Sequence, residues 1–221
     1  MDPLDHLAGP AADLLDRVDD VLAESGAPAT HRIWPLLRRV RALPAEAVAA
    51  LAALHPEPLA AAAAAVRALI PRYETVGELL TAAVDWEGAA AEAFFARRDA
   101  LAAHLTDGPT SMLDRLEAGA DYLDDLAGWV SSGRAALART LAEVLVSAEA
   151  VTLVVGDGID GGPSVPAAAA EIGARVLAPV AELHDRGEAL RRQWAQRLDE
   201  SIYRSSADVG VRFDGPSRIT L

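Results

Sequence analysis

Carboxylate clusters are the first candidates for chemistry, because paired carboxylates can act as general acid and general base. Two clusters occur at helical spacing: Asp13, Asp16, Asp19 and Asp20 form the first, and Asp121, Asp124 and Asp125 form the second. Neither has a third group in the sequence that would orient a carboxylate, so we interpret both as solvated helix faces. The chain also lacks cysteine, a Gly-x-Ser-x-Gly elbow and a Walker loop. The residues therefore predict a protein that is not an enzyme.

A glycine-rich stretch is the second candidate, since Gly156, Gly158 and Gly161 match the G-x-G-x-x-G pattern that lets a backbone approach a pyrophosphate. The run of apolar residues at 151–155 before it has the pattern of a strand. Pro163 and Pro166, however, fall where the phosphate-binding helix should already be running. We therefore expect an interhelical loop at 156–162 and no nucleotide cofactor.

Metal ligands are also absent from the sequence pattern. Asp157 and Asp160 do not have the spacing of a calcium loop. The histidines lie far apart, without a Glu-x-x-His or His-Glu-x-x-His pair: His6, His31, His55, His104 and His184. The formal net charge of −13 argues against nucleic acid, which would require a basic surface. We expect no metal, no cofactor and no nucleic-acid partner.

Helices are the elements that the sequence predicts throughout, because alanine is abundant and apolar residues recur at three-four spacing. Proline and glycine divide the chain into expected helical segments at 3–25, 32–41, 45–84, 86–106, 111–147 and 164–206, with a break near Pro71. The segment 111–147 carries an apolar seam from Leu113 to Val144 that only Arg134 interrupts. Short connections between long helices predict an all-α, elongated antiparallel bundle.

The expected organisation has three parts. Residues 1–44 form an N-terminal helical segment, 45–208 form the bundle, and 209–221 form an extended or disordered tail. The N-terminus lacks the basic and apolar regions of a secretory signal peptide, and no stretch of about 18 uncharged apolar residues occurs that could span a bilayer.

Trp86 and Gly88 form the most specific motif, a W-x-G at 86–88 between two alanine-rich segments, with Phe94 two turns further on. Glycine permits a turn without a Cβ clash, and the alanines allow another helix to approach closely. Over about residues 59–105 the chain resembles the WXG family, the helical-hairpin substrates of type VII (ESX) secretion systems of actinobacteria, and its longer PPE and EspB-like relatives. The resemblance implies export without a cleaved signal peptide, with the W-x-G turn as half of a composite export signal.

The other half of the family's signal is a tyrosine followed four residues later by an acid. Tyr73, Tyr122 and Tyr203 all lack an acid at that position, and Tyr203 lies best, with Asp208 five residues on. Either a partner chain supplies this half, or a degenerate version serves, or the protein is not exported.

The function we expect is therefore that of a non-enzymatic substrate or partner of a type VII secretion system. Trp86 and Gly88 would carry recognition by the secretion machinery or by a small helical WXG-like partner, and Phe94 in the same recognition segment would fix the turn against the bundle. The protein would be secreted or held at the cell surface. The alternative is a cytoplasmic scaffold that self-associates through the 113–144 seam as a coiled coil. A third possibility is an oligomeric membrane-docking or pore-forming protein that uses the 141–180 hairpin.

Overall fold

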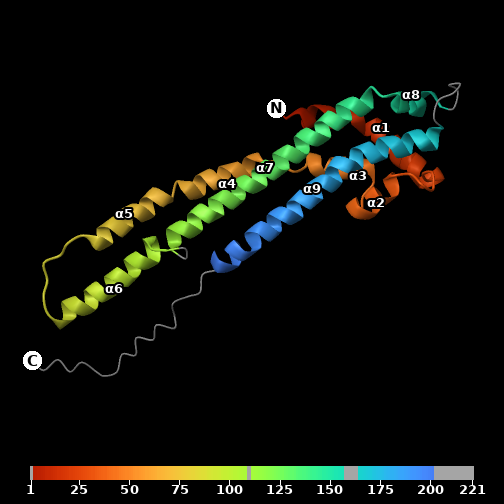
Figure 1. Cartoon of the computed structure of the whole chain (residues 1–221). Coiled ribbons are helices and arrows are strands. Elements are labelled where there is room, and N and C mark those ends of the chain that lie inside the picture. The colour runs from red at the N-terminus through yellow and green to blue at the C-terminus, as the bar shows by residue number, and fades with distance from the viewer. Residues whose placement is uncertain (1, 109–110, 157–163, 202–221) are drawn as a thin grey trace, which may run out of the picture.

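The computed structural model describes residues 2–108, 111–156 and 164–201, and helix is the only regular structure in them (Figure 1). The helices are α1 Pro3–Ser25, α2 Ile33–Val40, α3 Pro44–Ala52, α4 Glu57–Arg67, α5 Ile70–Thr81, α6 Ala89–Thr106, α7 Met112–Leu145, α8 Ala148–Val155 and α9 Val165–Ser201. The prediction of an all-α fold is confirmed.

Local chemistry explains where these helices begin. The Asp2 carboxylate accepts a hydrogen bond from the Leu4 N–H at 2.8 Å and caps α1. Ser111 and Ser147 cap α7 and α8 by accepting from backbone amides three residues on, at 3.1 and 3.2 Å. The predicted break near Pro71 lies between Arg67 and Ile70. Capping and proline therefore set most of the boundaries.

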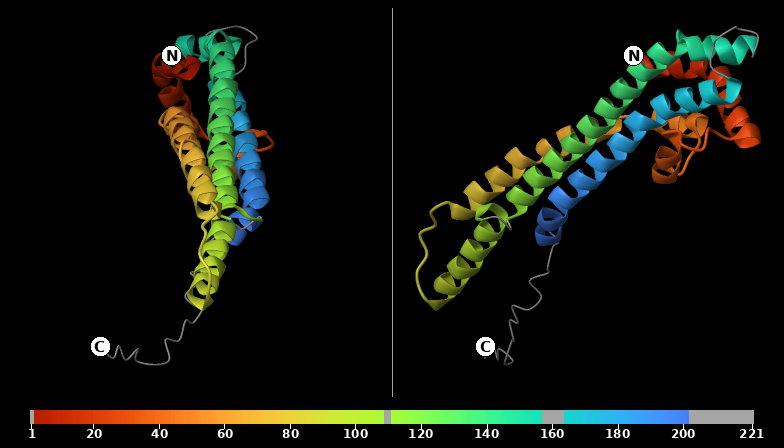
Figure 2. Two further views of the ribbon diagram at one scale, coloured as in Figure 1. Left: turned by 90° about the vertical axis from the view of Figure 1, so that its left-hand side faces the viewer. Right: turned by 45° about the vertical axis from the view of Figure 1, so that its right-hand side comes forward.

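α7 is the axis of an elongated antiparallel bundle (Figures 1 and 2). α4 packs along the N-terminal half of α7, and α9 runs antiparallel to α7 on another side. α5 and α6 continue past the shared length as a second pair of helices, which we call the distal hairpin (70–106). The distal hairpin alone therefore forms one end of the elongated molecule.

The main core lies at the opposite end, where α1, α2, α3 and α8 gather around the C-terminal half of α7 and the N-terminal half of α9. Side chains with at most 1% exposure come from all of these elements except α3, which contributes Val48 and Leu51 at 3 and 4%. The fully buried members include Leu15, Ile33, Leu137, Leu141, Leu153, Ile172 and Leu177. Residues 2–44 thus share one core with α7 and α9.

The α7 seam is covered by helices of the same chain. Ala120, Ala127, Val130, Leu137 and Val144 are all at most 8% exposed, because α1, α4 and α9 pack on this helix. Self-association through this seam, as the scaffold alternative expects, would require the bundle to open.

Arg134, which interrupts the seam, is itself fully buried and forms an ion-pair and hydrogen-bond centre. Its guanidinium binds the carboxylates of Asp2 and Asp5 at 2.5 Å each. It also donates to the carbonyl oxygens of Leu51, Ala52 and Leu54 at 3.1, 2.8 and 2.7 Å. These carbonyls belong to the last turn of α3 and the residues just after it, so one side chain joins α1, α3 and α7.

Two glycines set the close packing of α7 on α9. A Cβ on Gly133 would lie 2.5 Å from Leu183 Cδ2, and a Cβ on Gly187 would lie 3.0 Å from the Trp129 ring. Each helix therefore inserts a large side chain where the other has none. The Trp129 indole N–H also donates to the Leu183 carbonyl at 2.9 Å, which satisfies its polar atom.

Two further segments, 44–81 and 151–155, differ in structure from what their sequence pattern suggests. By length and composition alone, Pro44–Thr81 is apolar enough to cross a membrane. The mean hydropathy of an 18-residue window within it is 1.3, and 22% of that window is buried. The structure divides this segment into α3, α4 and α5. Residues 151–155, whose pattern resembled a strand, belong to α8, and Gly156 ends that helix with φ 85°.

Candidate functional site

The W-x-G motif lies at the far end of the distal hairpin, in an extended segment (82–88) between α5 and α6. The predicted helix start at Trp86 is three residues early, since α6 begins at Ala89. Gly88 caps α6 with φ 104° and ψ 170°, a conformation that other residues rarely adopt. Glycine is therefore required at this position to bring the extended segment into the helix.

Three aromatic rings pack together at this end. The Trp86 ring centroid lies 5.5 Å from that of Phe94 and 6.3 Å from that of Phe95, and the two phenylalanines are 5.7 Å apart. The tilted and edge-on geometries are those that aromatic pairs prefer. Phe94 was expected to pack the turn against the bundle; it instead packs the extended segment against α6.

Arg98 contacts the start of the extended segment, at Ala82, and holds it against α6. Its guanidinium lies 4.8 Å above the Phe95 ring and donates to the Ala82 carbonyl at 3.2 Å. The Asp99 carboxylate accepts two further hydrogen bonds from it, at 3.0 and 2.9 Å. We call Trp86, Phe94, Phe95 and Arg98 the aromatic tip.

Sequence reasoning missed Phe95 and Arg98. Their spacing of three residues, with Arg98 four residues after Phe94, puts them on one helical face and was the available signal. The sequence does not show that residues 82–88 run back along this face of α6.

The aromatic tip remains accessible although its rings pack together. Trp86 is 46% exposed and Phe94 47% exposed, and the neighbouring apolar side chains of the distal hairpin are also open to solvent: Val76, Leu79, Val84 and Leu101. Exposed apolar side chains that gather in one hairpin are typical of an interaction site. The arrangement can bind a partner.

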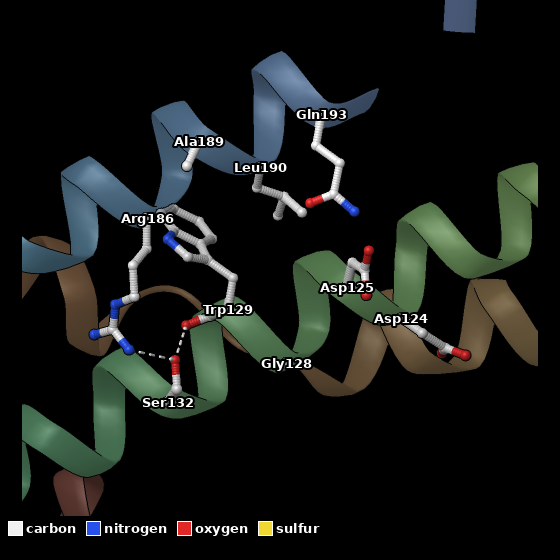
Figure 3. A pocket seen from close by; sticks show the side chains of 9 residues that line it. All are labelled: Asp124, Asp125, Gly128, Trp129, Ser132, Arg186, Ala189, Leu190 and Gln193. Atoms are coloured by element: carbon white, nitrogen blue, oxygen red, sulfur yellow. Dashed lines mark hydrogen bonds between the residues drawn. The ribbon is translucent and has the colours of Figure 1, made fainter. Parts of the chain in front are cut away.

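A groove between α7 and α9 is a second candidate, with a volume of about 480 Å³. Figure 3 shows the Trp129 ring reaching from α7 toward α9, with Arg186 beside it. Arg186 donates to the Ser132 hydroxyl at 3.4 Å, and Asp125 accepts from the Trp194 indole at 2.8 Å. These polar groups satisfy one another, so we interpret the groove as a consequence of helix packing.

The end of the molecule opposite the aromatic tip exposes a set of valines. Val146 is 84% exposed, and on α8 the exposed fractions are 50% for Val151, 67% for Val154 and 62% for Val155. Glu149, the charged residue of α8, is paired with Arg175 at 3.1 Å. This uncharged aliphatic surface belongs to the 141–180 region that was considered for membrane contact.

Several predicted features lie outside the described residues. Tyr203, Asp208 and the 209–221 tail are among them, as is the glycine-rich loop beyond Gly156. Within residues 2–108, 111–156 and 164–201 there is no group of three or more acidic or histidine side chains that could hold a metal.

Comparison with protein-family models, with curated proteins and with solved structures finds no match to this chain.

Proposed function

We propose that this chain is a non-enzymatic helical protein whose aromatic tip is recognised by a secretion machinery, as in the WXG and EspB-like type VII substrates, or by a small helical partner of that system. The observation that carries the proposal is the half-exposed Trp86, presented at the end of the molecule by a glycine with positive φ.

The surrounding geometry supports the same interpretation. α4 and α5 lead to the W-x-G segment, and α6 and α7 return antiparallel to them, which is the helical hairpin that the resemblance implies. The protein would be held in the cytoplasm and then exported to the medium or the cell surface. Half-exposed aromatic side chains are the residues in which binding energy concentrates once a partner buries them.

The direct test follows export from the native host. Trp86→Ala and Gly88→Ala should each reduce the amount of protein in the culture supernatant without reducing the amount in the cells. Val154→Ala, an exposed apolar residue at the opposite end, and Gly119→Ala, a helical glycine with open space at its Cβ position, are the matched controls. Unchanged export of both tip variants, or an absence of wild-type export, would refute the proposal.

Membrane docking through α8 is a second candidate function, favoured by the exposed valines at 146, 151, 154 and 155. Such a surface would enter the interface between lipid headgroups and acyl chains. It predicts that the purified protein sediments with uncharged phosphatidylcholine liposomes and that Val154→Asp abolishes this. A wild-type protein that stays in the supernatant would exclude it.

A further inference from the structure

We infer that the aromatic tip fits a protein partner whose apolar pocket is rimmed by arginine or lysine side chains. This inference rests on the proposed function, because it assumes that Trp86 is a recognition residue, and it adds the chemistry of the partner that receives it.

The centre of the surface is aromatic and held in place. Trp86 packs on Phe94 and Phe95, and Arg98 fixes both Phe95 and the start of the extended segment. A ring that is already ordered loses little side-chain entropy on binding. The fitting counterpart is a concave apolar pocket that covers the exposed half of the indole.

The rim of the surface is acidic. Asp85 and Glu87 flank Trp86 directly, and both are exposed. Among the residues that the structure describes, neither carboxylate forms an ion pair or hydrogen bond. Glu92 adds a third exposed carboxylate in the first turn of α6, where the helix dipole already favours negative charge.

Cations near this rim do not neutralise it. Arg98 is engaged by Asp99, Phe95 and the Ala82 carbonyl. Arg97 in α6 is exposed, so within residues 85–98 the three carboxylates that make no ion pair exceed the one cation, Arg97, that makes none. The tip therefore presents an aromatic centre within a negative field.

Charge complementarity selects among the possible occupants. A second copy in a two-fold contact would place Asp85 and Glu87 against the same acids of its partner, and like charges across an interface are costly. An anionic lipid surface would be repelled for the same reason. A pocket with a basic rim gains attraction and faster association from the same residues.

The test compares charge variants in the native host. Asp85→Lys/Glu87→Lys should lower export by about tenfold, since two attractive rim contacts become repulsive, and Asp85→Asn/Glu87→Gln should have a smaller effect in the same direction. Asp13→Lys/Glu24→Lys changes the net charge equally on the exposed face of α1 and should leave export within about twofold of wild type. Circular dichroism of each purified variant should match that of the wild type.

The outcomes separate this inference from the proposed function. If Trp86→Ala abolishes export while both 85/87 double variants export normally, the basic rim is refuted and the proposed function stands. If the α1 control loses export as much as Asp85→Lys/Glu87→Lys, the effect is one of net charge and the inference is also refuted. If Trp86→Ala exports normally, the proposed function fails and the inference fails with it.

Discussion

Asp19 should make the stability of this protein fall as the pH rises from about 5 to about 7.5. Its Oδ2 accepts a hydrogen bond from the Ala45 N–H at 3.1 Å near the start of α3, while its Oδ1 is buried and has no partner among the described residues. Burial raises the pKa of Asp19 from 3.8 to about 6, against the effect of the Ala45 hydrogen bond, and the charges of Asp16, Asp20 and Glu46 add to the rise.

The sign follows from the direction of this shift. Because the folded pKa is raised, the folded state binds the proton more tightly than the unfolded state, and the stabilisation present at low pH is lost as the pH rises through the window from 3.8 to about 6. The whole window corresponds to about 3 kcal/mol of unfolding free energy, of which about 1.4 kcal/mol falls between about pH 5 and about pH 7.5.

Asp19→Asn removes the charge and keeps an oxygen that can accept from Ala45. Urea unfolding of wild type and variant at the two pH values, followed by far-UV circular dichroism, should show the variant gaining about 1.4 kcal/mol relative to wild type at the higher pH. Other groups titrate in both proteins and cancel in the comparison. Asp13→Asn, on the exposed face of α1, is the control. Parallel pH profiles for wild type and Asp19→Asn would refute the reasoning.

Three further substitutions test the packing and the tip. Arg134→Met removes the cation that pairs with two carboxylates and the donor to three carbonyls, and should lower the free energy of unfolding by about 3 kcal/mol, against less than about 0.5 kcal/mol for the exposed Arg139→Met; equal losses in urea unfolding would contradict this. Gly133→Ala should destabilise by about 1 kcal/mol, since overpacking on Leu183 exceeds the gain in helix propensity, whereas Gly128→Ala on the open face of α7 should stabilise. Arg98→Met should increase amide hydrogen exchange across 83–88 severalfold without lowering the thermal midpoint. Unchanged exchange would show that Arg98 does not hold this segment in place.

The sequence by itself determined the helices and the fold class, because the signals for these are local. The seam on α7, the capping side chains and the proline and glycine positions are all contained within a few turns. The expected ends at 25, 106 and 111 agree closely with the structure, whereas the expected segment 45–84 is divided into α3, α4 and α5. The exceptions are also local. Because Gly88 is the N-cap of α6, this helix begins at Ala89 and not at Trp86. The Ser147 cap begins α8, which includes the residues with a strand pattern.

Tertiary structure alone decided which side chains meet across the chain. Arg134 breaks the seam of α7 in the sequence, yet its partner Asp5 lies 129 residues away and becomes a neighbour only when α1 packs on α7. The pairing of Trp129 with Gly187, and of Leu183 with Gly133, likewise depends on the register of α7 against α9. At the tip, the W-x-G motif was evident from the sequence. Its exposure and its attachment through Phe95 and Arg98 depend on the path of 82–88 back along α6, which backbone geometry and packing set together.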